Sequence, residues 1–229
     1  MRPVAHAVTA TSANSAETSK VVRNTYSLLS ITLLFSAVTA GVSMAVQPPM
    51  FTGLICSLVA MALIWFVLPK TANSGAGLGV VFAITGLLGF GLGPMLTHYL
   101  AMANGGMIVM NAMGTTGITF LGLSAYVLTT KKDFSFMGGF LMVGMFAVIG
   151  LAIISLIASF FFGMDMSVVS LAISGAVVLL MSGMILFETS RIVNGGETNY
   201  LIATVGLYLA IYNLFTALLH LFGAFSGDD

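Results

Sequence analysis

Long apolar runs separated by short polar breaks fill the chain from residue 26 onward. A bilayer core of ~30 Å needs roughly 20 apolar residues in a helix. Seven runs reach that length, at approximately 26–46, 50–68, 78–96, 107–128, 136–162, 166–187 and 200–225. The pattern predicts an all-α integral membrane protein with seven transmembrane helices joined by short loops.

The first 24 residues follow a different pattern. They are rich in Ala, Ser and Thr and contain no apolar core, so they do not have the form of a secretory signal. We expect residues 1–24 to form a flexible N-terminal tail and residues 25–229 to form the transmembrane bundle.

Composition supports the membrane class. Of 229 residues, 59% are hydrophobic and 6% are charged, whereas about a quarter of the residues of a soluble domain are charged. The net charge is zero, so nothing points to nucleic acid as a partner; the expected environment is the lipid bilayer. The single cysteine, Cys56, excludes a disulfide or a thiolate metal site within one chain, and we expect it to be a small buried hydrophobe.

Basic residues predict the orientation, because Lys and Arg accumulate in cytoplasmic loops. A cytoplasmic N-terminus places every basic residue of the chain on the cytoplasmic side, namely Arg2, Lys20, Arg23, Lys70, Lys131, Lys132 and Arg191. The opposite side then carries Asp165, Asp228 and Asp229. We therefore expect the C-terminus to lie outside.

Catalysis finds little support in the residues. Ser124 in "GLSA" could be a nucleophile and His220 a base, but the predicted topology separates them in depth by ~20 Å, and such a pair needs hydrogen-bond reach. We expect Ser124 to bond a carbonyl of its own helix. A His-Glu-x-x-His motif is absent and no run contains two acids. The sequence predicts no catalytic residue, no metal site and no cofactor.

A few polar residues remain inside the runs. Asn213, Thr216 and His220 are spaced by three and four residues and share one face of the last helix; they either bind it to a neighbouring helix or line a polar path. We expect Asn111 to be an amide that bonds another helix and His98 to lie at the membrane interface. The pair Gly89 and Gly93, spaced by four residues, predicts close helix packing.

The stretch "ILFETSRI", residues 185–192, places two charges inside an apolar pattern. Either the chain leaves the membrane there, or a charge is held within the bundle. Glu188 and Arg191 are three apart and can pair on one helix face, and Gly195 with Gly196 predicts the end of the helix. Glu188 and Arg191 are our candidates for a proton-sensing or gating role.

Five segments carry a resemblance: "KVVRNTYSLLS", "GFGLGPMLTHYL", "YVLTTKKDFSFMGGFLM", "ILFETSRIVNGGETNY" and "LYLAIYNLFTALLHLFG". Together they resemble the transmembrane Bax-inhibitor-motif family, and in particular its bacterial branch of FtsH-protease modulators, over residues 20–223. The resemblance implies six helices surrounding a central seventh in the bacterial inner membrane. It also implies a non-enzymatic regulator that associates with the hexameric, ATP-dependent membrane protease FtsH, restrains degradation of membrane proteins and is itself a slow substrate through its N-terminal tail.

Other members of that family carry an aspartate pair on the last two spans that shares a proton and gates a calcium leak. The corresponding positions here are Glu188 and Ala210, so the second carboxylate is missing. Coupled titration needs two interacting acids. The sequence therefore argues against calcium as a partner, and a pH-sensitive leak of calcium or protons remains the alternative function.

Overall fold

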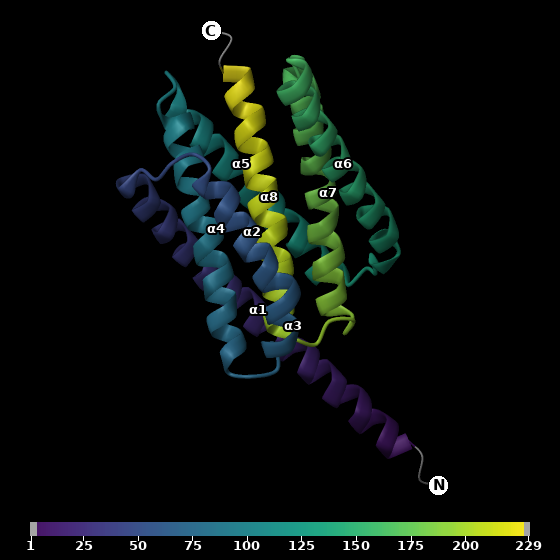
Figure 1. The fold of residues 1–229 in the computed structure, drawn as a ribbon. Coiled ribbons are helices and arrows are strands. Elements are labelled where there is room, and N and C mark those ends of the chain that lie inside the picture. Colours follow the sequence, from purple (N-terminus) through teal and green to yellow (C-terminus); the bar gives the residue numbers. More distant parts are fainter. Residues whose placement is uncertain (1–3, 227–229) are drawn as a thin grey trace.

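The computed structural model describes the backbone of residues 4–226 and the side chains of residues 17–226. That part of the chain is helical, without a strand. Arg2, Asp228 and Asp229 lie outside the described residues. The elements are α1 (Val4–Val46), α2 (Thr52–Ala62), the π-helix η1 (Leu63–Val67), α3 (Leu68–Thr71), α4 (Ala76–Leu100), α5 (Gly105–Thr130), the 3₁₀-helix η2 (Ser135–Met137), α6 (Gly138–Phe162), α7 (Ser167–Val193) and α8 (Tyr200–Ser226) (Figure 1).

Seven spans are confirmed: within the described residues, seven helices are long and apolar enough to cross a membrane, with α2, η1 and α3 forming one of them. The predicted boundaries hold to within four residues, except at the N-terminus and at the end of the sixth run, which extends six residues further, to Val193. At the N-terminus α1 begins at Val4 and includes most of the segment predicted as a tail, in line with its high alanine content. The flexibility of that segment stays a prediction.

The second span changes its helical geometry near Pro69. Proline has no N–H to donate to the carbonyl four residues earlier, and the turn that precedes it is the π-helix η1. The chain nevertheless continues as α3 to Thr71. The sequence predicted a break at this proline, but the helix passes through it with one widened turn.

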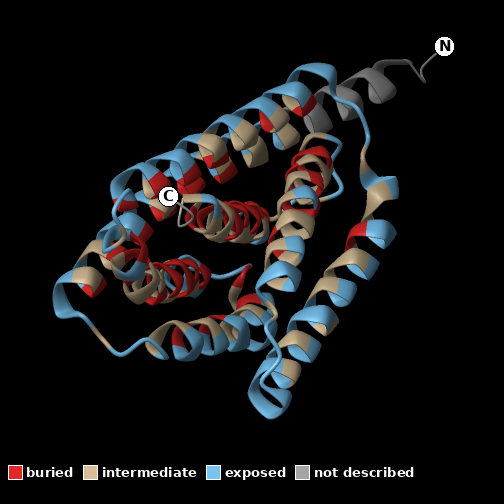
Figure 2. Cartoon of the chain, turned by 90° about the horizontal axis from the view of Figure 1, so that it is seen from above, coloured by how far each residue is buried: buried red, intermediate tan, exposed pale blue. Residues whose placement is uncertain are grey.

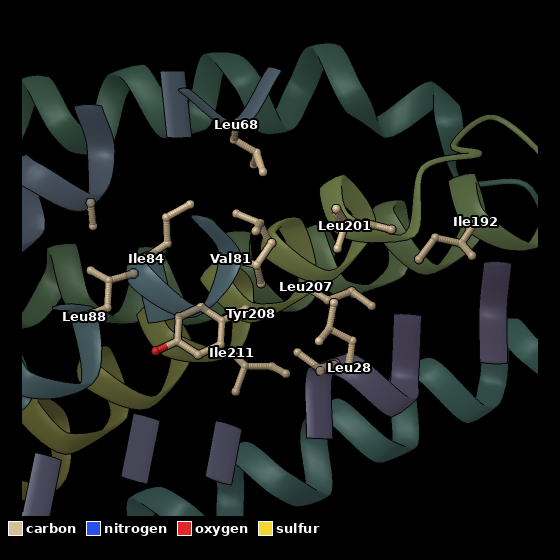
Figure 3. Close-up of a cluster of buried hydrophobic side chains, with 14 residues drawn as sticks. Leu28, Leu68, Val81, Ile84, Leu88, Ile192, Leu201, Leu207, Tyr208 and Ile211 are labelled. Carbon is tan, nitrogen blue, oxygen red and sulfur yellow. The ribbon is translucent and has the colours of Figure 1, made fainter. Parts of the chain in front are cut away.

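The bundle is organised around α8, the most buried of the seven spans. It packs against α1, α4, α5 and α7, while α2 packs on α4 and α6 packs on α7 (Figures 1 and 2). A central seventh helix is therefore confirmed, with four helices in direct contact and two in an outer position. Figure 3 shows Leu201, Leu207 and Tyr208 of α8 packed among apolar side chains of α1 and α4.

Polar contacts join α1, α4 and α8 inside this core. The hydroxyls of Ser36 and Tyr208 lie 2.5 Å apart, and the carbonyl oxygen of Thr85 lies within hydrogen-bond distance of both, at 3.0 and 3.3 Å, so that one hydroxyl donates to the other and the second donates to the carbonyl. Gly89 and Gly93 face α1: an added Cβ would collide with Ser36 at the first position and with Ser43 at the second. The packing role predicted for the two glycines is confirmed.

The two ends of the bundle differ in charge. One end, called the basic end below, contains the loops 72–75, 131–134 and 194–199 and every basic residue of the described chain. The opposite end contains the loops 47–51, 101–104 and 163–166, of which only the last carries a charge, on Asp165. The positions that the sequence singled out fall into two groups, one near each end.

Candidate functional site

The end of α7 carries a three-residue charge cluster. The Nη1 of Arg191 lies 3.4 Å from the Oε2 of Glu188, and its Nη2 lies 3.1 Å from the Oε2 of Glu197 in the following loop. The side chains of the two acids are 14% and 12% exposed and that of Arg191 is 31% exposed. The Arg191 guanidinium also lies over the ring of Phe187, 5.5 Å from its centre. One arginine thus bridges two nearly buried carboxylates, which offsets the cost of burying them.

The carboxylate of Glu188 lies against the backbone of α8 at Gly206. A Cβ at that glycine would come within 3.1 Å of the Cδ of Glu188. Ala210, the α8 position that the resemblance pairs with this acid, is one turn further on and buried. Since α8 contains no acidic residue, the acid nearest to Glu188 through a described contact is Glu197, which is reached by way of Arg191. The arrangement is an ion-paired triad, with no pair of facing carboxylates.

The two residues between Glu188 and Arg191 bind other elements. The Thr189 hydroxyl lies 3.3 Å from the Tyr26 hydroxyl of α1 and 3.5 Å from the Ser124 hydroxyl of α5. The Ser190 hydroxyl accepts a hydrogen bond of 2.8 Å from the backbone N–H of Phe134 and donates toward Asp133. The four consecutive α7 residues 188–191 therefore contact different elements. Residue 188 contacts α8, residue 189 contacts both α1 and α5, residue 190 contacts the α5–α6 loop, and residue 191 contacts the α7–α8 loop.

Backbone geometry fixes the loop that supplies Glu197. Gly195 has a φ of +76°, and the N–H of Gly196 donates to the carbonyl of Arg191 at 2.7 Å, so α7 ends in a Schellman motif. Asn199 caps α8 by accepting from the N–H of Leu201 and donates to the carbonyl of Ala72 in the α3–α4 loop, each at 2.9 Å. The predicted helix stop at the two glycines is confirmed, and the loop is held from both sides.

The polar face of α8 lies in the other half of the molecule. Asn213, Thr216 and His220 line one hollow of about 660 Å³ between α6, α7 and α8. The His220 Nδ1 lies 2.9 Å from the Ser174 hydroxyl of α7, whereas Asn213 and Thr216 donate to carbonyls of their own helix. The sequence left two alternatives for this face, contact with a neighbouring helix or the lining of a polar space. His220 contacts a neighbouring helix, and all three residues line the hollow.

Two expectations for single polar residues are wrong. Ser124 approaches Thr189 of α7 and has no described hydrogen bond to its own helix, because the "ETSR" stretch brings a second hydroxyl next to it. Asn111 is exposed and has no hydrogen bond among the described residues, because its side of α5 points away from the bundle.

Two other expectations agree with the structure. His98 lies exposed at the end of α4, edge-on to the ring of Tyr99. Cys56 is buried as a free cysteine. Both residues therefore have the structural roles expected of them, one at the end of a span and one in the core.

Sequence reasoning missed Glu197, Thr189, Ser190 and Asn199. Asn199 had a usable signal, because asparagine directly before an apolar run is a preferred helix cap. Glu197 could have been found as the one acid in the loop that follows Arg191. The partners of Thr189 and Ser190 come from residues 56 to 163 positions away and depend on the tertiary arrangement.

The chemistry available at the α7 terminus is limited. Ser124 and His220, the candidate nucleophile and base of the sequence, hydrogen-bond to different parts of α7 near opposite ends of the bundle. The described residues contain no group of three or more His, Cys, Asp or Glu side chains that could hold a metal ion. The triad and its neighbours connect elements, and the arrangement is that of a structural junction which a partner or a proton could perturb.

Comparison with known proteins shows which proteins this chain is similar to. The family model described as inhibitor of apoptosis-promoting Bax1 matches residues 18–227. The chain is 49% identical to an Escherichia coli protein named "Modulator of FtsH protease YccA", over 92% of this chain and 93% of the relative. It is 48% identical to an uncharacterized membrane protein of Vibrio cholerae, over 93% of each chain. It is 46% identical to an uncharacterized protein of Pseudomonas aeruginosa, over 95% of each.

Those matches span all seven helices and include the segments that carried the resemblance. The family model covers more than half of the chain, and the relatives are similar along almost their whole length. The chain belongs to the Bax inhibitor family.

Proposed function

We propose that this protein is a non-enzymatic regulator of an FtsH-type membrane protease and restrains its degradation of other membrane proteins. The observation that carries the proposal is the 49% identity, over 92% of the chain, to the Escherichia coli protein named as a modulator of that protease. The site geometry is consistent with it, because the buried charges are paired with one another.

The direct test is whether the two proteins associate. The protein, tagged after Asp229 and expressed at its natural level, is purified in mild detergent and its partners are identified by mass spectrometry. We expect the protease to be enriched over an equally tagged, unrelated seven-span protein. Equal recovery of the protease with both baits would contradict the proposal.

The proposed location is the bacterial inner membrane, with the N-terminus in the cytoplasm and the C-terminus in the periplasm. One-sided basic loops support it, as does the name of a second Escherichia coli relative, "Inner membrane protein YccA". A reporter active only in the periplasm should be active when fused after Asp229 and silent when fused after Asn24. The reverse pattern would overturn the orientation.

The N-terminal segment is the proposed handle by which the protease slowly degrades this protein. The family model begins only at residue 18, so the preceding residues lie outside the shared fold. Residues 17–21 belong to the packed part of the protein. Glu17, Thr18, Lys20 and Val21 line a hollow of about 650 Å³ against the α7–α8 loop. The other basic-end loops are short and tethered at both ends, so a protease that threads a chain from a free end has no better starting point there.

A truncation at the edge of the shared fold tests the handle. Removing residues 2–16 keeps the contacts of residue 17 onward and should lengthen the protein's lifetime in cells that contain the protease. Replacing the same residues by a Gly-Ser segment of equal length is the control, since flexible polar sequence should restore degradation. An unchanged lifetime of the truncated protein would exclude the segment as the handle.

A pH-sensitive cation leak remains the alternative function, and it can be measured. Wild-type protein, Glu188→Gln and Ala210→Asp are compared for calcium flux into proteoliposomes across a pH series. Because α8 supplies no carboxylate opposite Glu188, we expect no pH-gated flux in the wild type. A pH-gated flux that Glu188→Gln abolishes would support a cation conductor in place of the protease regulator.

A further inference from the structure

An apolar groove lies between α1 and α5, on a different face of α8 from Asn213 and His220. Both helices pack against α8 but scarcely touch each other, so a space of about 470 Å³ stays between them, with α4 and α8 as its floor. On α1 its lining runs from residue 33 to residue 44, and on α5 from residue 109 to residue 120. This space is called the α1–α5 groove below.

The groove lies in the half of the membrane away from the basic loops. On α1 and on α5 alike, its lining covers about 16 Å at 1.5 Å per residue. It approaches the last residue of α1, Val46, and the first residue of α5, Gly105, which both lie at the end opposite the basic loops. One leaflet contributes about half of the ~30 Å hydrocarbon core. The groove therefore has about the length of one leaflet.

The groove opens sideways into the lipid. Ala37 of α1 and Met113 of α5 belong to its lining and are also exposed. Next to them, the large apolar side chains of Leu34, Val38 and Met110 are exposed on the outside of the same two helices. Since α1 and α5 are both membrane-spanning helices, this outer surface is the interface with the bilayer. The groove is thus continuous with the lipid-facing surface.

Aromatic side chains close the groove toward the basic end. Phe120 of α5 belongs to the lining, and its ring centre lies 6.1 Å from that of Tyr26 of α1. This contact bridges the two helices that the groove separates further along. The hydroxyl pair of Ser36 and Tyr208 joins α1 to α8 at the floor. The groove is therefore blind at its inner end, about half-way through the membrane.

The lining offers little to a polar ligand. It contains no charged residue, and the hydroxyls of Ser36 and Tyr208 donate to one another and to a carbonyl of α4. The Thr116 hydroxyl donates to a carbonyl of its own helix at 2.6 Å. The Tyr212 hydroxyl faces Ser57 of α2, a helix that does not line the groove. Buried water needs two to four polar partners, so we infer that the groove is dry.

Its width decides between a hydrocarbon chain and a helix. Spread over about 16 Å, a volume of about 470 Å³ leaves a channel roughly 6 Å across. A helix with its side chains is 10–12 Å across and does not fit. Carbon atoms of neighbouring hydrocarbon groups pack about 4 Å apart, so one extended chain fits along the groove. An unfilled groove would deprive its lining of these contacts.

We propose that the α1–α5 groove binds one acyl chain of a membrane phospholipid, which enters sideways from the leaflet opposite the basic loops. The chain lies along Ile211 and Phe215 of α8 and ends at Phe120, while the headgroup stays at the membrane surface near the loop 101–104. Lipid tails are as apolar as this lining, so contact area and fit hold the chain in place. This site goes beyond the proposed regulation of the protease and does not depend on it.

Lipid retention by glycine variants of α5 tests the site. Gly117 lines the groove and Gly114 does not, and an added Cβ at either meets nothing within 4 Å. Gly117→Phe therefore places a ring in the groove, and Gly114→Phe, which places one outside it, is the matched control. Protein in dodecyl maltoside is incubated with dioleoyl phosphatidylglycerol, freed of unbound lipid and weighed by native mass spectrometry.

We expect the wild type and Gly114→Phe to retain one phospholipid and Gly117→Phe to retain at least about tenfold less. Ala37→Phe fills the groove from the α1 side and replaces Gly117→Phe if that variant fails to fold; its control is Val38→Phe, at an exposed position outside the lining. No retained phospholipid in the wild type, or equal retention by the blocking and control variants, would overturn the site. So would loss of the co-purified protease from Gly117→Phe with its lipid unchanged, which would assign the groove to a partner's helix.

Fluorescence quenching tests where the chain lies. Trp65→Phe removes the single native tryptophan; Met113→Trp then reports from the rim of the groove, and Met110→Trp, on the outside of α5, is the control. In detergent, phosphatidylglycerol brominated at mid-chain should quench Met113→Trp at roughly tenfold lower concentration than Met110→Trp. Adding Gly117→Phe should abolish this difference. Equal quenching of the two reporters would show that the chain does not lie in the groove.

Discussion

The two ends of this bundle differ in how many of their polar side chains bond other elements. At the basic end, polar groups of α7 bond groups of other elements, as Thr189 does with Tyr26 and Ser190 does with Phe134. At the opposite end, Asn213 and Thr216 donate to carbonyls of their own helix, and of the three polar residues on this face of α8 only His220 contacts another helix, at Ser174 of α7. Hydrogen bonds between distant segments stabilise a tertiary arrangement, whereas bonds within one helix leave the space beside it free.

Helix packing shows the same difference. Near the basic end, Leu141 of α6 is buried against α7 next to Gly183, but it is the only buried residue of the described α6. Beyond this contact α6 exposes one large apolar side chain after another. We infer that the basic end carries most of the polar stabilisation. The variants below test this difference, and thermal unfolding in detergent can be followed by a thiol-reactive dye at the buried Cys56.

The largest effect is expected from Arg191→Ala. The change leaves the nearly buried carboxylates of Glu188 and Glu197 without their shared partner. Removing one member of a buried ion pair costs about 3 kcal/mol, which corresponds to a loss of roughly 6–12 °C in Tm for a chain of this size. Asp165→Asn, at the opposite end, should change the Tm by less than about 2 °C. Similar losses for both variants would contradict the difference between the ends.

A somewhat smaller loss is expected from Gly206→Leu. The added side chain must displace the Glu188 carboxylate, since the Cβ alone would come within 3.1 Å of its Cδ. Overpacking of this kind costs about 2 kcal/mol, or roughly 4–8 °C in Tm. Gly114→Leu on α5 is the control, because an added Cβ there meets nothing within 4 Å. A Tm of Gly206→Leu equal to that of the control would show that Glu188 does not lie against α8.

Thr189→Val should lower stability by about 1 kcal/mol, because it removes the hydroxyl shared with Tyr26 and Ser124 while keeping the shape of the side chain. Thr216→Val removes a hydroxyl that bonds only its own helix and should cost less than half as much. The measurement is the difference in Tm between the two variants. The comparison between the ends fails if Thr216→Val is the more damaging of the two.

The smallest expected effect is a pH dependence from Asp133. Hydrogen bonds from the Ser135 side chain and backbone, with a further one from Ser190, hold the pKa of this loop carboxyl below its usual range. A pKa that is lower in the folded state gives stabilisation that is complete above the unfolded pKa, about 3.9, and is lost as the pH falls through the folded pKa. Asp133→Asn should therefore flatten the fall of Tm below about pH 4. Ser190→Ala should flatten this fall of Tm in part. An unchanged dependence of Tm on pH in both variants would show that Asp133 does not contribute to it.

Much of the fold could be predicted from the sequence because lipid leaves few choices. Backbone groups in a bilayer must be bonded within helices, so apolar runs separated by Pro, Gly and charged residues gave all seven spans. The path through Pro69 was not predicted, since proline usually ends or kinks a helix at the preceding residue. The helix over residues 4–24 was also missed, because low hydrophobicity was taken as a sign of flexibility.

Less of the candidate site could be predicted. Spacing alone identified Glu188 with Arg191 and the α8 face of Asn213, Thr216 and His220. It could not show that Gly206 receives the Glu188 carboxylate, because that contact depends on the rotation of α7 against α8.

Client turnover tests the central claim, regulation of a membrane protease, most directly. The FtsH-type protease of the same cells and one of its membrane-protein substrates are reconstituted in liposomes with ATP, with or without this protein at a fixed molar ratio. We expect substrate degradation to slow several-fold in its presence, while degradation of a soluble unfolded substrate changes much less. An equal rate of membrane-substrate degradation with and without the protein would contradict the account.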